Sequence, residues 1–245
     1  MRVSVVIPAF NEAKGVAQTT ANLLLVLNVL QNSYKTEIIF VDDGSTDDTR
    51  PLLQSAWNGD ETVKIVAHEQ NRGLGAALRT GFSYATGDIV VTTDFDGTYA
   101  FELIPTIVEQ LVRDEVDIVT ASPYHPAGHV EGVPKYRLMF SYGASLLYRL
   151  LVKWQVHTWT ALFRAYRRPV IEHVQFESNG FLAGTELLVY ALQAGYTVSE
   201  FPATLKTRSF GQSNIKIARV TRSHLIFQLK ILRRRLKNLF QRPSP

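Results

Sequence analysis

Short apolar runs alternate with amphipathic segments through the first half of the chain. The runs have the length of buried strands, which predicts strands at residues 3–7, 37–41, 63–67, 88–93 and 116–120. Between the runs, apolar positions recur with a helical period, which predicts helices at about 12–31, 47–57, 74–86 and 101–113. Strands that alternate with helices form a parallel sheet covered on both faces. The pattern therefore predicts an α/β fold with one mostly parallel sheet.

The pattern changes after residue 122. Residues 123–135 are rich in Pro, Gly and His, which predicts a mobile loop. We expect further helices at about 136–153, 184–194 and 216–240, a strand near 197–201 and a second loop at 205–215. We therefore predict one domain over 1–215, with halves 1–122 and 123–215, followed by a basic amphipathic segment over 216–245.

Composition and charge narrow the chemistry. The 245 residues include no cysteine, which excludes disulfide scaffolds, cysteine–zinc sites and thiol nucleophiles. The net charge is +4, and residues 219–242 carry eight Lys or Arg side chains and no acid. This basic amphipathic pattern is typical of a helix at a lipid surface, although a helix packed on the domain with a solvated basic side has the same pattern. No stretch reaches the ~20 apolar residues that span a bilayer, and no signal peptide is recognisable.

Polar clusters follow the predicted strands, at the edge where open α/β sheets bind ligands. Asp94 and Asp96 come directly after the fourth strand, and side chains at i and i+2 of an extended chain point the same way. Two converging carboxylates repel each other unless a cation lies between them, and oxygen ligands suit Mg²⁺ or Mn²⁺. Taken alone, the sequence Asp94-Phe95-Asp96 is more simply explained as a solvated turn.

Three further clusters carry weaker signals. Asp42 and Asp43 can bind a base edge or ribose hydroxyls, but taken alone they are better explained as a helix cap followed by a turn. Gly73 opens a helix where backbone amides can approach a phosphate, and an ordinary turn is the alternative. Phe10 can stack on a nucleobase, or it belongs to a segment that only ends a strand.

The order and spacing of these clusters are more specific than any one of them. The series PAFNE, VDDGSTD, NRGLGAA and GDIVVTTDFD resembles the N-terminal half of family 2 glycosyltransferases with the GT-A fold, over residues 1–122. Residues 136–214 more specifically resemble the dolichyl- and polyprenyl-phosphate sugar synthases. That second resemblance rests on Arg137 and Ser141, the run Phe163-Arg164-Ala165-Tyr166-Arg167, Glu186, and Arg208, Gly211 and Ser213.

The resemblance implies inverting, metal-dependent transfer of a hexose from GDP-mannose or a UDP-sugar to a polyprenyl or dolichyl phosphate. Residues 1–122 would bind the nucleotide sugar, through Pro8, Phe10, Glu12, Asp42, Asp43, Gly73 and Asp94. Mg²⁺ or Mn²⁺ would be held by Asp94, Asp96 and Thr98. The catalytic set would be Asp96, Arg137, Ser141 and Arg208. The chain would act at the cytoplasmic face of a membrane, as a peripheral protein or anchored by segments outside this sequence.

Two alternatives stay open at this point. A family 2 transferase can also extend a glycolipid or polysaccharide hydroxyl, which would require a general base such as Glu186. A basic, non-catalytic module would instead bind nucleotides or nucleic acid, but the paired carboxylates would repel phosphates without a metal, and we expect no nucleic-acid partner. Arg164 is either a phosphate-binding cation or a member of a surface ion pair.

Overall fold

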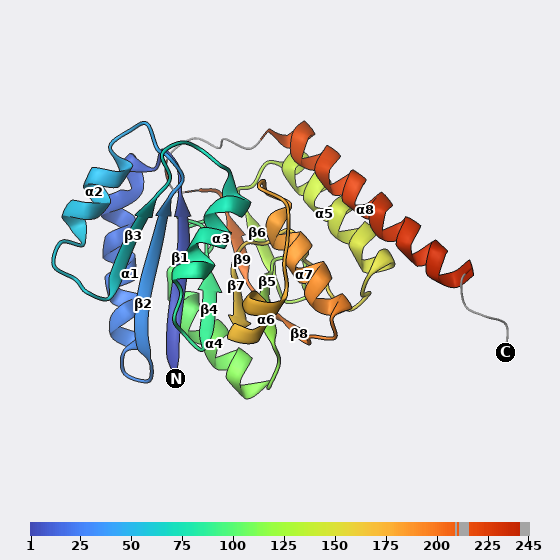
Figure 1. Cartoon of the computed structure of the whole chain (residues 1–245), viewed down its shortest axis with the longest axis horizontal. Coiled ribbons are helices and arrows are strands. Elements are labelled where there is room, and N and C mark those ends of the chain that lie inside the picture. Colours follow the sequence, from blue (N-terminus) through green and yellow to red (C-terminus); the bar gives the residue numbers. More distant parts are fainter. Residues whose placement is uncertain (209, 211–215, 241–245) are drawn as a thin grey trace.

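A seven-stranded sheet forms the centre of the computed structural model, which describes residues 1–208, 210 and 216–240 (Figure 1). Its strand order is β3-β2-β1-β4-β7-β5-β8. The strands are β1 Arg2–Ala9, β2 Lys35–Asp42, β3 Val63–Ala67, β4 Ile89–Thr92, β5 Ile118–Ser122, β7 Arg164–Arg167 and β8 Val198–Pro202. Six of these lie where the sequence predicts strands, and the expected α/β fold is confirmed.

Strand β7 is the element that the apolar pattern does not predict. It lies between β4 and β5 and runs antiparallel to both, while the other neighbouring pairs of the sheet are parallel. Ala165 is its central partner, opposite Val91 of β4 and Val119 of β5. Because β7 is only four residues long and has arginine at both ends, it contains no apolar run that would predict a strand.

Helices cover both faces of the sheet (Figure 1). Val5, Phe40 and Val91 belong to the hydrophobic core on one face of the sheet. Val6 and Val41, which follow Val5 and Phe40 in β1 and β2, point to the other face, because side chains alternate along a strand. The first face is covered by η1 Ala13–Gly15, α1 Val16–Leu30, η2 Phe101–Leu103 and α4 Ile104–Arg113, with α2 Thr49–Ala56 packed on α1. The second face is covered by α3 Leu74–Tyr84, α6 Arg168–His173 and α7 Ala183–Gln193.

Two segments expected to be loops are joined in a second, two-stranded sheet. Strand β6 His129–Glu131 pairs in parallel with β9 Thr204–Lys206, so the expectation of irregular loops at 123–135 and 205–215 is wrong at these residues. Residues 209 and 211–215 of the second loop, including Gly211 and Ser213 of the family motif, lie outside the described residues. The backbone N–H of Lys206 also donates to the Thr98 carbonyl oxygen at 3.0 Å, which ties this small sheet to the loop after β4.

The helices α5 Lys135–Leu151 and α8 Ile217–Phe240 lie side by side at one end of the molecule (Figure 1). Gln228 of α8 donates through Nε2 to the Ala144 carbonyl oxygen at 3.0 Å, and Arg235 donates to the carbonyl oxygens of Leu150 and Leu151. The predicted C-terminal helix is therefore present and packs on α5, whereas the domain boundaries at 122 and 215 stay predictions. Within the ranges that the structure describes, no helix combines the length and apolar character needed to cross a bilayer.

Candidate active site

A polar cavity of about 840 Å³ opens at the carboxyl ends of β1, β2 and β4. All but one of the predicted site residues line this cavity. The lining residues among them are Pro8, Phe10, Glu12, Asp43, Gly73, Asp94, Asp96, Thr98, Arg137, Ser141 and Arg208. The exception is Asp42, which is buried at the end of β2 and accepts a hydrogen bond from the Ser45 N–H at 3.2 Å. At Asp42 the structure thus places a turn-forming side chain, and its predicted contact with the nucleoside finds no support in the cavity lining.

The loop after β1 is fixed by the loop after β2. Asn11 adopts a positive φ of 57°, and its side-chain oxygen accepts from the Thr46 N–H at 2.8 Å. Its own N–H donates to the Ser45 hydroxyl at 2.9 Å, and the Glu12 N–H donates to the Thr49 hydroxyl at 2.7 Å. These bonds set the positions of the two site side chains carried by the loop, Phe10 and Glu12.

Asp43 organises the opposite wall of the cavity. One of its oxygens accepts from the Gly73 N–H at 2.7 Å, and the other accepts from the Arg72 N–H at 3.0 Å and contacts His68 Nδ1 at 2.6 Å. Gly73 has a φ of 92°, which a side chain would strain, and a Cβ there would lie 2.3 Å from the Asn179 carbonyl oxygen. Asp43 therefore holds the glycine-rich loop at the start of α3 against the cavity.

Three carboxylates gather around one guanidinium on the floor of the cavity. Arg208 Nε lies 3.0 Å from Asp96 Oδ2, and Arg208 Nη2 donates to Glu12 Oε1 at 2.5 Å. The second oxygen of Asp96 accepts from the Thr98 N–H at 3.0 Å and from the Thr98 hydroxyl. Burial, reinforced by the negative charges of Asp96 and Glu12, raises the pKa of Asp94 to about 8, although Arg208 opposes the rise.

The carboxylates fit a divalent cation. Glu12 Oε2 is buried and has no hydrogen-bond partner among the described residues. The pKa of Asp94 is raised first by burial and then by the negative charges of Asp96 and Glu12, and a bound cation would offset both causes. Among the described residues, no three His, Asp or Glu side chains form a complete metal cluster. Asp94 and Asp96 are thus the residues that could hold Mg²⁺ or Mn²⁺, with further oxygens from a ligand and water, because Thr98 directs its hydroxyl to Asp96.

A second cavity of about 630 Å³, here called the apolar channel, runs between α5 and α8. Its wall is mostly apolar and includes Met139, Phe140, Leu146 and Leu147 of α5 and Val220 and Leu225 of α8. Asp94, Thr98, Tyr124, Arg137, Ser141 and Phe181 line both cavities, so the channel meets the polar cavity at these side chains.

Hydrogen-bond donors are concentrated where the two cavities meet. Arg137 lies in the first turn of α5, and its Nε is buried without a hydrogen-bond partner in the described part of the chain. Ser141 lies one turn later and shares a 2.7 Å hydrogen bond with the Thr160 hydroxyl. The structure thus places the guanidinium of Arg137, with this buried Nε, where the polar cavity meets the apolar channel.

Comparison with known families decides the class of the protein. The model of glycosyl transferase family 2 matches residues 4–175, which is more than half of the chain. The chain belongs to glycosyl transferase family 2. It is therefore a glycosyltransferase, and this membership argues against the alternative of a non-catalytic binding module.

Curated relatives of this glycosyltransferase include two enzymes named for lipid-phosphate acceptors. It is 32% identical over 218 residues to the dolichol-phosphate mannosyltransferase of Pyrococcus furiosus, covering 88% of the chain and 60% of the relative. It is 31% identical over 222 residues to the polyprenol monophosphomannose synthase of Mycolicibacterium smegmatis, covering 87% of the chain and 81% of the relative. The chain thus spans less than two thirds of the length of the first of these proteins.

Solved structures confirm the GT-A-like fold of the glycosyltransferase. Glucosyl-3-phosphoglycerate synthase from Mycobacterium tuberculosis, in complex with Mn²⁺, uridine diphosphate and glucosyl-3-phosphoglycerate, aligns with a TM-score of 0.70 at 21% identity. The alignment covers 93% of this chain and 79% of that one. A complex of the same protein with Mg²⁺ and uridine diphosphate aligns with a TM-score of 0.69 at 19% identity, over 93% of this chain and 79% of that one.

Two residues of the family motifs have structural positions that differ from the expectation. Arg164 is fully buried in β7 and not in a surface ion pair; it donates to the Thr120 hydroxyl at 2.9 Å, to the Trp159 carbonyl oxygen at 2.6 Å and to the Gly184 carbonyl oxygen. Glu186 is 3% exposed, and its Oε2 accepts from the backbone N–H groups of residues 177 and 178. Its carboxylate braces a loop, which argues against its role as a general base.

Sequence reasoning missed Tyr124 and Phe181, which line both cavities. Tyr124 follows the last residue of β5 by two positions, so the rule that ligands bind at the carboxyl ends of strands could have identified it. Phe181 lies in the loop before α7 and is 43% exposed. No sequence signal marks it, because the packing of that loop on Gly73 and Gly75 is visible only in the fold.

Proposed function

We propose that this glycosyltransferase transfers a hexose from a nucleoside diphosphate donor to a polyprenyl phosphate, with inversion at the anomeric carbon. One observation carries the proposal: the apolar channel meets the polar cavity at Arg137, whose buried Nε has no hydrogen-bond partner among the described residues. A prenyl chain requires an apolar channel, and a phosphate requires a cation at its end. The names of the two curated relatives support the same acceptor.

The donor would occupy the polar cavity. Phe10 offers an aromatic face for the nucleobase, and the loop at Gly73, held by Asp43, presents backbone to the nucleotide. Asp94 and Asp96 would hold Mg²⁺ or Mn²⁺, which supplies positive charge to the diphosphate when bound. Arg208, beside Asp96, provides a second cation for the charge that develops on the leaving group.

The reaction is a displacement at the anomeric carbon. A phosphate oxygen of the acceptor forms the new bond to this carbon, while its bond to the diphosphate breaks and the electron pair leaves with the nucleoside diphosphate. Because the acceptor phosphate is already an anion, the step needs no general base. Glu186 is engaged in bracing a loop, which favours this reaction over the alternative transfer to a hydroxyl group. The residues of the chain orient the acceptor through Arg137 and Ser141.

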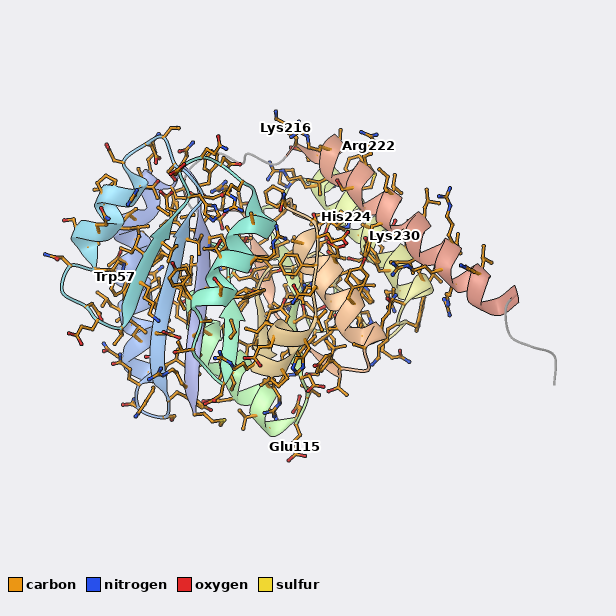
Figure 2. All side chains as sticks on the ribbon, viewed as in Figure 1. Trp57, Glu115, Lys216, Arg222, His224 and Lys230 are labelled. Carbon is orange, nitrogen blue, oxygen red and sulfur yellow. The ribbon has the colours of Figure 1, made fainter. Side chains whose placement is uncertain are left out.

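The same end of the molecule fits a membrane surface. Exposed apolar side chains of α5 and α8 include Met139, Leu150, Ile226 and Leu229, all more than half exposed. Basic side chains of α8, among them Arg222, project outwards, whereas His224 lies on the side of α8 that faces α5 and α7 (Figure 2). Apolar and cationic side chains on one helix suit an anionic lipid surface, so we propose a location at the cytoplasmic face of a membrane.

Transfer assays with matched acceptors test the proposal. Labelled GDP-mannose and UDP-hexoses would be offered with a prenyl phosphate or with the corresponding prenol, in the presence of Mn²⁺ or a chelator. We expect a metal-dependent product from the phosphate alone. Arg137→Met should reduce turnover roughly a hundredfold, while Arg149→Met, on the same helix but stacked on Trp154, should retain it. Transfer to the prenol but not to the phosphate would refute the acceptor assignment.

A further inference from the structure

The hydroxyl group of Tyr124 lies where the two cavities meet. Its oxygen is buried and makes no hydrogen bond with any described residue, while the side chain lines both the polar cavity and the apolar channel. A buried hydroxyl without a partner destabilises a fold, and such groups are rare in proteins unless a ligand completes them. The position therefore indicates a ligand atom that accepts a hydrogen bond.

The ring of Tyr124 is held from two sides. Its backbone N–H donates to the Thr158 hydroxyl at 3.3 Å, and that hydroxyl is hydrogen-bonded to Ser122 at 2.8 Å. On the other side, the ring lies edge-on against Tyr142 of α5, with centroids 5.4 Å apart. The hydroxyl group is thus preorganised, and a ligand would meet it without a large loss of side-chain entropy.

The neighbouring groups define the ligand chemistry. Arg137 also lines both cavities, and its buried Nε has no hydrogen-bond partner in the described part of the chain. The Ser141 hydroxyl lies near the phenol and acts to lower its pKa, and it also shares a 2.7 Å hydrogen bond with the Thr160 hydroxyl. Burial raises the pKa of Tyr124, which keeps its hydroxyl group protonated as a donor at neutral pH. A guanidinium and two hydroxyl groups around one space match an anion with several acceptor oxygens.

We propose that the Tyr124 hydroxyl donates a hydrogen bond to a non-bridging oxygen of the acceptor phosphate and so helps to select the oxygen that attacks. The proposal rests on the proposed lipid-phosphate acceptor. Arg137 balances the charge of the phosphate, whereas Tyr124 is a neutral donor and restricts rotation of the phosphate without adding charge. With two oxygens held, a third is left facing the anomeric carbon.

Tyr124→Phe removes only the hydroxyl group and is the direct test, with Tyr142→Phe as the matched control because Tyr142 is 50% exposed and its ring would be retained. We expect kcat/KM for the prenyl phosphate to fall about ten- to hundredfold in Tyr124→Phe, with the donor KM unchanged. Because the hydroxyl is unpartnered in the ligand-free protein, the same variant should melt at an equal or higher temperature. A purely structural role would lower the melting temperature.

The outcomes separate the two proposals. If the wild-type enzyme glycosylates the prenyl phosphate and Tyr124→Phe does so equally well, the role of Tyr124 is wrong while the acceptor assignment stands. A rise in the KM for the donor, with an unchanged KM for the acceptor, would indicate that Tyr124 contacts the donor and would also overturn the inference. If the wild-type enzyme does not use a prenyl phosphate, the proposed function fails first, and the inference falls with it.

Discussion

Acidification should loosen the packing of α8 on α5 through one buried side chain, His224. This residue is 4% exposed, and its Nδ1 lies 3.0 Å from the hydroxyl group of Tyr148 on α5. Burial lowers the pKa of His224 from 6.5 to about 4, because an imidazolium would lose its hydration between the two helices. Burial also raises the pKa of Tyr148, so at neutral pH the tyrosine remains protonated.

The direction and size of the effect follow from these two pKa values of His224. As the pH falls, the unfolded chain takes up the proton first, near 6.5, while the folded protein resists it until about 4. Stability is therefore lost between these values and is highest above 6.5. Between pH 7.5 and pH 5 the loss amounts to about 2 kcal/mol from this side chain.

Urea unfolding of the wild type and His224→Gln at both pH values measures this difference. Asp94 titrates with the opposite sign, since its raised pKa favours the folded state as the pH falls below about 8, but it is present in both proteins and cancels in the comparison. The exposed His173 provides the control through His173→Gln. If the stability difference between wild type and His224→Gln is the same at pH 5 and pH 7.5, the desolvation argument is wrong.

Three substitutions test other parts of the structure. Arg164→Met removes a donor from three buried oxygens, of which the Trp159 carbonyl keeps a second donor in the Thr185 hydroxyl. It should destabilise the protein by about 3–5 kcal/mol and lower Tm by roughly 10 °C, whereas Arg167→Met should cost about 1 kcal/mol. Gly75→Ala should cost about 1–3 kcal/mol in urea unfolding, because its Cβ would lie 2.0 Å from a backbone oxygen, while Gly180→Ala has free space and should be neutral. Asp96→Asn should retain the fold by circular dichroism and reduce metal-dependent turnover roughly a hundredfold or more; unchanged turnover would contradict the metal site.

The strands of the first half and the polar cavity could be predicted from the sequence because their signals are local. Each strand is an apolar run, and each cluster of polar residues follows a strand directly, so the carboxyl-end rule brings residues such as Phe10, Asp43 and Asp94 together without any tertiary information. The rule works less well for single residues. Asp42 and Asp43 are adjacent and chemically identical, but side chains alternate along the chain, so only Asp43 lines the cavity.

Features that depend on distant contacts could not be predicted in this way. Arg208 meets Glu12 across 196 residues of sequence, through the small sheet that joins β9 to β6. Arg164 carries a charge, and a charged residue usually indicates a surface position. Its burial is explained only by the position of β7 in the middle of the sheet. There the carbonyl oxygens of Trp159 and Gly184 accept hydrogen bonds from its guanidinium.

Contacts between the glycine loop and the loop before α7 explain how the polar cavity and the apolar channel are held together. The Gly75 N–H donates to the Asn179 carbonyl oxygen at 2.8 Å, and Glu186 fixes the same loop from the other side. Asp43 holds Gly73 at the polar cavity, while Phe181, in the same loop as Asn179, lines the channel as well as the cavity. A shift of this loop would therefore change both cavities at once. The buried carboxylate of Glu186 thus fixes a loop that lines both cavities, and the proposed phosphate acceptor, which requires no general base, is compatible with this structural role.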